Sequence, residues 1–447
     1  MSAATMEPPA SRVINVSEYI DQHPVGAFQI RVLLICAAVL FIDGFDTQAI
    51  GYVAPALAAE WKLQRAVLGP VFSAGLFGLM IGALIFGTLA DRIGRKWIIV
   101  LSTAAFGVGT LATMFAQDVT WLIALRFLTG LGLGGAMPNA TALSAEFSPH
   151  QRRATMVMAM FVGFSIGAAL GGLLAAALIP AFGWRSVFLV GGLAPLPLVP
   201  LLVRALPESV RYLALVGGRD HEVADLLRRV APLANPAGAL RFVVDEPRLP
   251  GLPVAHLFAE GRAVMTLLLW IVFFVSLLDL YLLSNWLPTV LNDLGVSFSA
   301  AAAIGAMLQV GGVVGAFALG RFIDRFSFRA LAFTYLCAAV AVAAIGVSGH
   351  SLGLVSLAIF AAGFCIIGAQ IASNALTATH YPTAIRSTGV GWALGIGRAG
   401  SIVGPLIGGA MLVHQTGVRS LFTVAAIPAL VAAAASLALA RVAQPGK

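Results

Sequence analysis

Charged side chains inside long apolar stretches are the residues of this 447-residue sequence best placed to do chemistry. Five stand out: Asp43, Asp46, Arg126, Asp279 and Arg398. A charge in hydrocarbon surroundings is costly, so such residues mark proton, ion or ligand sites by default. The chemistry that these residue types allow is reversible protonation of a carboxyl and recognition of an anion by a guanidinium.

The spacing of these charges predicts that they lie at similar depth. Asp43 and Asp46 are three residues apart, so they share one helix face. From a helix start near residue 30, a rise of about 1.5 Å per residue places them roughly 20–24 Å from that side, and Arg126 lies about 9 Å from the opposite side. In an apolar layer of about 30 Å these depths agree. Asp279 should lie at the level of Asp46 and Arg398 near the middle, so we expect one shared cavity.

A structural alternative stays open for the same residues. Asp43 or Asp46 could form a buried ion pair with Arg126 that only orients helices. Removing one partner of such a pair destabilises a protein strongly, so loss of function alone would not separate the two interpretations.

The composition shows which elements must position these charges. Hydrophobic residues make up 60% of the chain, charged residues only 10%, and the mean hydropathy is +0.95, whereas soluble proteins carry about 25% charged residues. The chain is therefore predicted to be an all-α membrane protein. Its net charge of +8 would suit a nucleic-acid partner, but the basic residues cluster in alternate loops, which is typical of membrane topology. We expect a lipid bilayer and no nucleic acid as partners.

Twelve apolar segments of about 20 residues or more are long enough to cross a bilayer. They are 28–52, 67–90, 97–116, 120–145, 155–179, 187–206, 264–289, 300–322, 330–348, 353–378, 388–412 and 420–440. The predicted organisation is a cytoplasmic segment 1–27, a six-helix bundle 28–206, a cytoplasmic linker loop 207–263, a second six-helix bundle 264–441 and a cytoplasmic tail 442–447. Arginines are concentrated in that loop, so the positive-inside bias places both termini in the cytoplasm.

The two bundles are copies of one another. Adding 233 carries Asp46 onto Asp279, and the same offset carries Pro55 onto Pro288. It also carries Gly87 onto Gly320, Asp91-Arg92 onto Asp324-Arg325 and Arg153 onto Arg386. A constant offset in a very apolar chain is typical of transporters whose halves rock around a central site.

A charged turn between the second and third spans forms a further candidate site. It reads Gly87-Thr-Leu-Ala-Asp91-Arg92-Ile-Gly94-Arg95-Lys96. Gly87 would permit close helix approach, and Asp91 could accept hydrogen bonds from a neighbouring helix N-terminus. The second copy retains Asp324 and Arg325 but has Ser327 in place of the later glycine. Together with Arg386, these charges could take part in a conformational change or could merely fix topology.

Other polar residues near span ends have two interpretations each. Glu146, close to Arg152, could form a gate salt bridge or be an ordinary interfacial carboxylate. His380, at the matching end of the tenth span, could handle protons or be structural. Five residues could stack on and hydrogen-bond to a small ring, although aromatic residues near span ends also form interfacial belts. These five are Asn139, Tyr281, Asn285, Trp286 and Asn374.

Small residues recur every four positions in two spans. They are Gly163, Gly167 and Gly171 in the fifth span and Gly400, Gly404 and Gly408 in the eleventh. We interpret both rows as helix-packing stripes.

These motifs together resemble the major facilitator superfamily. The turn Gly87–Lys96 and the string that runs from Arg126 to Gly132 are its signatures at these places. Within it, Asp43-Gly-Phe-Asp46 resembles the aromatic acid:H⁺ symporters, as do the strings at 126–140, 179–184, 206–213 and 395–398. The likeness covers nearly the whole chain and is closest to the bacterial 4-hydroxybenzoate/protocatechuate type.

The resemblance implies a specific function. It implies proton-coupled uptake of a small aromatic carboxylate across the bacterial cytoplasmic membrane by alternating access, with protons as the coupling ion, no other cofactor and a monomeric protein. Arg398 and Arg126 would bind the carboxylate, Asp43 or Asp46 would carry the proton, and the charged turn would latch the outward-open state. Asp279 has no counterpart role in the family and is a further proton-coupling candidate only because it lies inside an apolar span. Which aromatic acid is carried stays open.

Two rival functions use the same scaffold. A proton-driven exporter of drugs or other organic ions is the first, and carboxylate-ready arginines argue against cationic cargo. A solute sensor is the second, and no output domain is visible. An enzyme is not expected, because the sequence contains no nucleotide loop, zinc-ligand spacing or nucleophile constellation.

Overall fold

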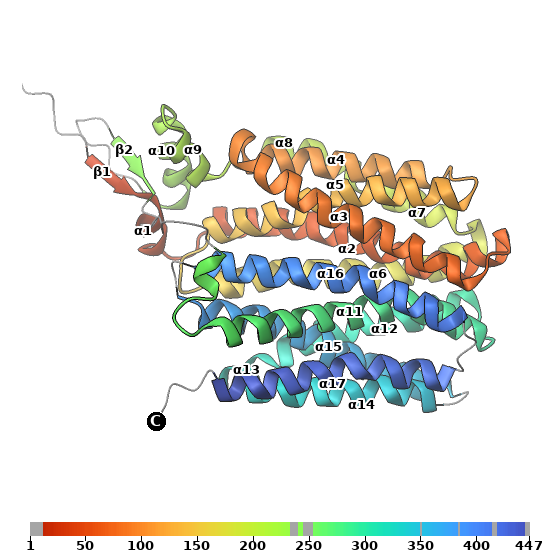
Figure 1. Cartoon of the computed structure of the whole chain (residues 1–447). Helices are drawn as coiled ribbons and strands as arrows, with labels where there is room; N and C mark the ends of the chain where they lie inside the picture. Colours follow the sequence, from red (N-terminus) through yellow and green to blue (C-terminus); the bar gives the residue numbers. More distant parts are fainter. Residues whose placement is uncertain are drawn as a thin grey trace, which may run out of the picture.

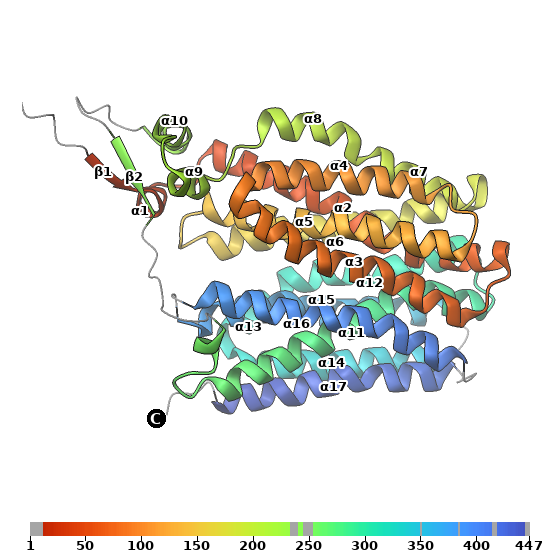
Figure 2. The ribbon, with the colours of Figure 1, turned by 45° about the horizontal axis from the view of Figure 1, so that its top comes forward.

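The structure is a computed structural model that describes residues 12–232, 240–244, 254–348, 351–382, 385–413 and 418–442. Two bundles of long helices lie side by side, the first coloured orange to yellow-green and the second green to blue (Figures 1 and 2). Twelve helical segments among the described residues are long and apolar enough to cross a membrane. The predicted fold class, an all-α membrane protein of two six-helix repeats, is confirmed.

The first bundle contains seven helices for six crossings. They are α2 (Ala27–Trp61), α3 (Arg65–Ile93), α4 (Arg95–Thr113), α5 (Val119–Glu146), α6 (Arg153–Phe182), α7 (Arg185–Leu193) and α8 (Pro195–Ala205). The sixth predicted span is divided into α7 and α8 because Pro195 lacks the backbone N–H that would continue the hydrogen-bond ladder. Together α7 and α8 still make one crossing.

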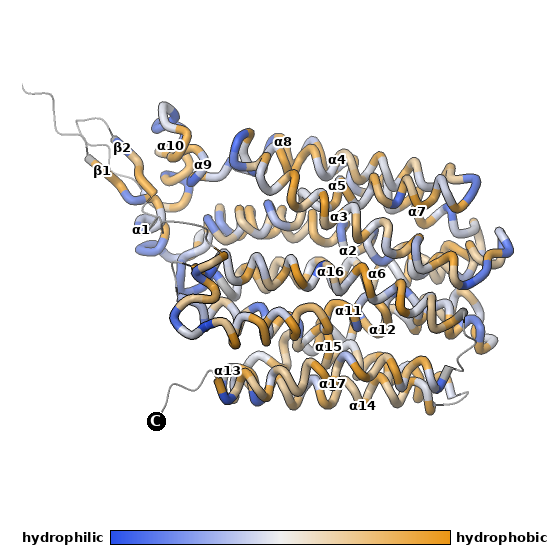
Figure 3. The backbone as a smooth tube through the Cα atoms, viewed as in Figure 1, coloured by the Kyte–Doolittle hydropathy of each residue, from blue (hydrophilic) through white to orange (hydrophobic). Residues whose placement is uncertain are grey.

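The second bundle repeats this arrangement. Its helices are α11 (Ala263–Asp293), α12 (Phe298–Ala318), α13 (Gly320–Phe326), α14 (Phe328–Val347), α15 (Leu352–His380), α16 (Arg386–Val413) and α17 (Val418–Val442). Proline occupies the repeat-related positions Pro55 in α2 and Pro288 in α11. Apolar residues dominate both bundles, whereas hydrophilic residues gather at the ends and in a small cap at one end (Figure 3).

The cap joins the N-terminal segment to the loop between the bundles. It consists of β1 (Arg12–Asn15), α1 (Val16–Asp21), α9 (Val210–Val216), α10 (Asp220–Val230) and β2 (Leu240–Val243), and the short helix η1 (Ala255–Leu257) follows. β1 and β2 pair in parallel, and the Tyr19 hydroxyl donates to the Ala231 carbonyl at 3.1 Å. Ile20 and Leu227 share a core with Val32 of α2, so the cap is fixed to the first bundle.

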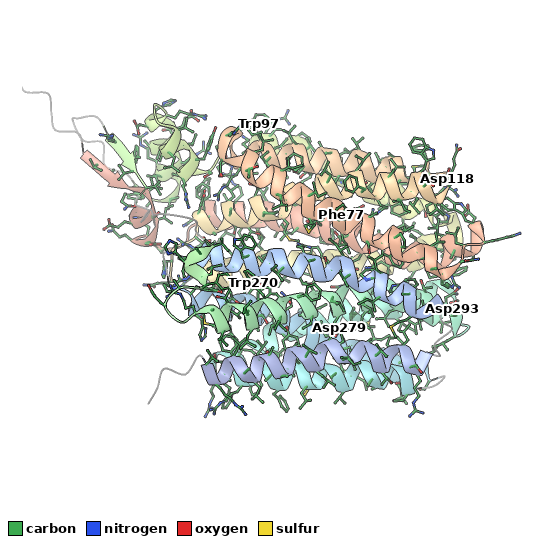
Figure 4. All side chains as sticks on the ribbon, viewed as in Figure 1. Phe77, Trp97, Asp118, Trp270, Asp279 and Asp293 are labelled. Carbon is green, nitrogen blue, oxygen red and sulfur yellow. The ribbon has the colours of Figure 1, made fainter. Side chains whose placement is uncertain are left out.

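Two names describe the ends of the molecule below. The cap end carries the cap, and the distal end is the opposite one. In Figure 4 the labelled Trp97 and Trp270 lie toward the cap end, whereas Asp118 and Asp293 lie at the distal end.

Glycines set the close approach of helices within each bundle. A Cβ on Gly167 of α6 would lie 1.8 Å from the Phe41 carbonyl oxygen of α2. A Cβ on Gly400 of α16 would lie 2.0 Å from the Phe274 carbonyl oxygen of α11. A side chain does not fit at either position, so both predicted packing stripes are confirmed.

The two bundles contact each other in their distal halves. A Cβ on Gly51 of α2 would lie 2.8 Å from the Ser284 carbonyl oxygen of α11, and the Ser73 hydroxyl donates to the Ile402 carbonyl at 2.8 Å. Arg65, the first residue of α3, forms an ion pair with Asp293, the last residue of α11. These contacts close the distal end.

Four glycines in the cap-end halves of the bundles have no neighbouring helix close to them. A Cβ added to Gly87, Gly320, Gly391 or Gly395 would meet no atom within 4 Å, and the two ribbons run apart toward this end (Figure 2). The expectation that Gly87 mediates close helix approach is therefore wrong for this conformation. In this conformation the bundles are apart at the cap-end glycines and in contact at the distal end.

Candidate functional site

An ion pair in the middle of the first bundle joins α2 to α5. Arg126 Nη1 lies 3.4 Å from Asp46 Oδ2, and its Nη2 donates to the Asp46 carbonyl at 3.3 Å. The Thr110 hydroxyl of α4 donates to Asp46 Oδ1 at 2.6 Å. The exposed fraction is 0% for the Asp46 side chain and 3% for that of Arg126. Asp46 is therefore held in place from two helices, and no solvent supports its charge.

Asp43 lies one turn before Asp46 and has a different environment. It is fully buried, and its Oδ1 accepts a hydrogen bond from the Thr47 hydroxyl at 3.0 Å. Its Oδ2 has no hydrogen-bond partner. Asp43 lies close enough to Arg398 of the second bundle to interact with it electrostatically. One carboxylate oxygen is thus left available at the interface between the bundles.

Arg398 of α16 reaches toward the first bundle. Its Nη2 donates to Met137 Sδ of α5 at 3.1 Å, and its Nη1 donates to the Tyr281 hydroxyl of α11 at 3.4 Å. A thioether is a weak acceptor, and neither partner is an anion. The guanidinium can therefore exchange these contacts for a carboxylate, which offers a bidentate charged partner.

A cavity of about 10 Å³ lies between the bundles beside these charges. Thr47, Phe72, Gly75, Arg126 and Asn285 are among its lining residues. This volume is near the threshold for a single water molecule. The contacts at the distal end therefore leave little free space beside Arg126 in this conformation.

The four central charges balance. Asp43, Asp46, Arg126 and Arg398 carry two negative and two positive formal charges when all are ionised. They come from α2, α5 and α16, so both bundles contribute. An anion that enters this site adds a net negative charge unless a proton enters with it.

Asp279 does not belong to this group, so the expectation that it lines the same cavity is wrong. It precedes Tyr281 by two residues, which turns it about 200° around α11. Both of its carboxylate oxygens are buried without a hydrogen-bond partner, and it interacts electrostatically with Tyr335 of α14. Asp279, labelled in Figure 4, thus interacts within the second bundle, whereas Asp46 accepts a hydrogen bond from Thr110 of α4 within the first.

The residues predicted to bind a ring divide into three groups. Tyr281 and Asn285 lie at the interface, where Tyr281 contacts Arg398 and Asn285 lines the cavity with its Oδ1 unpartnered. Asn139 Nδ2 donates to the Gly135 carbonyl of its own helix at 2.8 Å, and Asn374 Oδ1 is buried without a partner.

Trp286 forms the third group, and its predicted contact with a ring ligand is wrong in this conformation. Its Nε1 donates to the Pro405 carbonyl of α16 at 2.9 Å. Its ring stands edge-on to Phe72 of α3, with centroids 5.1 Å apart. Because Phe72 and Trp286 come from different bundles, the indole closes the distal interface and does not line an open site.

The charged turn at the cap end has two parts with different roles. Glu146 Oε1 pairs with Arg95 Nη1 at 2.5 Å and not with the predicted partner Arg152. Both belong to the first bundle, so this ion pair does not cross between the bundles in the conformation described. Asp91 and Arg92 are exposed.

Glu208 was not recognised in the sequence as a structural partner of this turn. Its Oε1 accepts from the backbone N–H groups of Arg95 and Lys96 at 2.8 and 3.1 Å, so it caps the start of α4. Gly94 has φ +94°, and a Cβ there would lie 2.2 Å from Glu208 Oε2. The helix start requires glycine for both reasons.

The repeat-related residues of the second bundle are described only in part. The Arg325 guanidinium lies 5.4 Å from the Phe326 ring centroid, and Arg386 is the first residue of α16. The side chain of Asp324 lies outside the described residues. His380 Nδ1 lies 2.8 Å from the Leu376 carbonyl oxygen, and its ring packs on Phe328 at 4.6 Å, which favours the structural interpretation.

A larger cavity of about 360 Å³ lies at the cap end, away from the central charges. Its lining includes Trp97, Arg219, Glu222 and Arg229. Arg219 donates to both Glu222 oxygens at 2.6 and 2.7 Å, and these hydrogen bonds lower the pKa of Glu222. Arg219 and Glu222 thus already pair at this cavity. The sequence itself predicts no site here.

Two six-helix repeats with charges at their shared midplane define a membrane transporter that works by alternating access, and not an enzyme. The chain belongs to the Major Facilitator Superfamily, whose family profile matches residues 36–392 and 269–447.

Relatives and solved structures agree with this assignment. The chain is 44% identical to the gallate transporter of Pseudomonas putida over 97% of this chain and 96% of that protein. It is also 44% identical to the 4-hydroxybenzoate transporter PcaK of Pseudomonas aeruginosa over 96% of each. Its fold is similar to an inward-facing bacterial homologue of the human lysosomal transporter Spinster, with a TM-score of 0.71, 19% identity and coverage of 94% and 98%. It is also similar to the xylose transporter XylE from E. coli, with a TM-score of 0.70 and 16% identity over 92% of this chain and 97% of that one.

Proposed function

We propose that this protein takes up a small aromatic carboxylate together with protons across the bacterial cytoplasmic membrane. The proposal has the cap end in the cytoplasm, which agrees with the basic loops. The single observation that carries it is Arg398, a partly buried guanidinium at the interface between the bundles that donates hydrogen bonds to a thioether and a tyrosine hydroxyl. The 44% identity to transporters named for gallate and 4-hydroxybenzoate supports the substrate class.

Arg398 would receive the substrate carboxylate. A carboxylate can replace the weak Met137 acceptor and form two parallel charged hydrogen bonds. Tyr281 and Asn285 lie beside this position, so an aromatic ring could pack against α11. Both bundles contribute to the site within one chain, which supports a monomer as the working unit.

Asp43 would carry the proton. Its Oδ2 is free of partners, whereas Asp46 is held by Arg126 and Thr110. The central charges are balanced before substrate binds, so one proton per monoanionic substrate restores neutrality. A membrane potential opposes anion entry by about 2.3 kcal/mol per charge per 100 mV, and co-transport of one proton removes that opposition.

Rocking of the bundles would alternate access to this site. The described conformation is closed at the distal end by Gly51, Trp286 and the Arg65–Asp293 pair. In the opposite conformation the distal contacts separate, and Asp91 and Arg92 would latch the cap end. Protons are the proposed coupling ion, and no further cofactor is required.

Uptake in proteoliposomes tests the proposal. A labelled aromatic acid should accumulate when the outside is acidic, and an uncoupler should abolish accumulation. Asp43→Asn should lose gradient-driven accumulation while it retains exchange of labelled for unlabelled substrate, because exchange needs no net proton movement. The matched control Asp225→Asn makes the same chemical change at an exposed acid of α10 and should retain gradient-driven accumulation.

Three outcomes would contradict the proposal. Uptake that persists without a proton gradient would reject proton coupling. Accumulation by Asp43→Asn would remove Asp43 from the proton path. Efflux of an organic cation without any uptake of aromatic acids would favour the proton-driven exporter.

A further inference from the structure

Gln370 of α15 is a buried amide that the proposed mechanism does not use. Only 7% of its surface is exposed. Neither its Oε1 nor its Nε2 has a hydrogen-bond partner. Burying an amide without partners is costly, and nearly all such groups in proteins are satisfied. An amide that is unsatisfied at both atoms is therefore expected to meet a partner in another state of the protein.

The helix geometry directs Gln370 away from lipid. Leu354 and Leu357 of α15 are 57% and 64% exposed and mark its outer face. At about 100° per residue, Gln370 lies roughly 160° around the helix from Leu354 and 140° from Leu357. Asn374, one turn further along, also has an unpartnered buried oxygen. The inner face of α15 thus carries two neighbouring amides.

The sequence repeat locates the same side chain relative to the central site. The offset of 233 carries Met137 of α5 onto Gln370. Met137 crosses the interface to contact Arg398 Nη2. Because the two bundles are related by approximate two-fold symmetry, Gln370 occupies the corresponding position in the second bundle. The pair differs in chemistry, with a thioether on one side and an amide on the other.

We infer that Gln370 recognises a hydroxyl group on the aromatic ring of the substrate. A carboxamide donates and accepts hydrogen bonds, and a phenolic hydroxyl does the same. With the carboxylate on Arg398, Gln370 would contact a ring substituent, and its unsatisfied atoms would gain partners only when a hydroxylated acid is bound. This inference rests on the proposed function and extends it to selectivity among aromatic acids.

The test compares hydroxylated and plain substrates in one variant. Gln370→Met introduces the residue of the repeat-related position and keeps a similar size. Inhibition constants of 4-hydroxybenzoate, 3-hydroxybenzoate, benzoate and 4-fluorobenzoate are measured against a labelled substrate in proteoliposomes. The preference for the hydroxylated acids over benzoate should fall about tenfold, because a buried hydroxyl would lose its partner. Affinity for benzoate and 4-fluorobenzoate should be retained.

Gln48→Met is the matched control. Gln48 is also a buried glutamine, with its Nε2 unpartnered, but it lies about 140° around α2 from Asp43. Its replacement should leave the preference unchanged, whatever its effect on overall rate. Gel-filtration profiles of both variants show whether the protein is folded.

The outcomes separate the two proposals. An unchanged preference in Gln370→Met, or an equal loss for all four acids, overturns the role of Gln370 while wild-type uptake stands. If the wild-type protein takes up and binds none of the acids, the proposed function fails and this inference fails with it. A selective loss for one hydroxyl position supports the inference and identifies the position that Gln370 recognises.

Discussion

Two aspartates at equivalent positions of the repeat have opposite environments. Asp46 contacts Arg126 and Thr110, whereas both oxygens of Asp279 lack hydrogen-bond partners. The offset of 233 carries Arg126 onto Ile359, so the second bundle has no guanidinium at the matching place. Removing one member of a buried ion pair destabilises the protein, because the other charge is left buried without a partner. Asp279 has no such partner, so replacing it leaves no buried charge behind.

This difference predicts unequal effects of the same substitution. Asp46→Asn should abolish gradient-driven accumulation and lower thermal stability, because Arg126 is left as an uncompensated buried charge at a cost of about 3–5 kcal/mol. Asp279→Asn should retain accumulation and stability. Uptake and thermal unfolding in detergent are the measurements.

A double variant separates function from structure at Asp46. Asp46→Asn with Arg126→Gln removes both charges and should recover much of the stability. Recovery of uptake along with stability would show that the pair only orients helices. Loss of accumulation in Asp279→Asn would return Asp279 to the proton path.

At the scale of elements, the start of α4 depends on one backbone conformation and one carboxylate. Gly94 ends α3 and precedes α4 with φ +94°, and Glu208 of the segment before α9 caps the helix. The interaction links the charged turn to the cap. A residue with a Cβ would be strained by its backbone and would also displace Glu208.

Gly94→Ala should therefore reduce stability more than the same change at a glycine in open space. Gly295 provides that control, since its φ is +87° and an added Cβ would meet no atom within 4 Å. Strain of this kind costs about 1–3 kcal/mol, and Gly94→Ala carries the steric term in addition. Thermal unfolding of both variants measures the difference. Equal shifts would show that the contact with Glu208 adds nothing.

At the scale of the whole molecule, glycines at the two ends of the interface should control different conformations. A Cβ on Gly51 would lie 2.8 Å from the Ser284 carbonyl oxygen of the opposite bundle. A Cβ on Gly87 would meet no atom within 4 Å in this conformation. A large side chain at Gly51 prevents closure of the distal end. A large side chain at Gly87 does not clash here but would clash where a closed cap end brings helices together.

Both Gly51→Leu and Gly87→Leu should thus stop transport. The first should hold the distal end open, and the second should hold the cap end open. In a background with the native cysteines replaced, Leu76→Cys places a thiol in the central cavity. An impermeant thiol reagent added outside should label it faster in Gly51→Leu and more slowly in Gly87→Leu than in the parent. Similar labelling rates in the two variants would contradict the assignment of the two ends.

Much of this architecture could be predicted from the sequence. Apolar length gave twelve spans, and the constant offset gave two bundles, because both follow from local patterns. Depth along the helices brought Asp46 and Arg126 together. The direction of Asp279 was missed because depth was considered without rotation, although its two-residue separation from Tyr281 contains that information.

Other features required neighbours that the sequence does not bring together. β1 and β2 are short strands more than 200 residues apart, and Glu208 caps a helix that begins about 110 residues earlier. Trp286 resembles a ring-binding residue by type, but its partners on α3 and α16 determine its role. Gln370 is an ordinary polar residue in the sequence, and only its lack of partners draws notice.

The distal rim treats its two repeat-related acids differently. Glu60 pairs with Arg185 of the same bundle, whereas its counterpart Asp293 crosses to Arg65 of the other, with side chains about one-third exposed (32% and 34%). A pair so accessible is weakened by dissolved ions. With the distal end outside, as proposed, high external ionic strength would weaken this one cross-bundle pair and favour opening of the distal end, whereas the Glu60–Arg185 pair within one bundle would leave that balance unchanged.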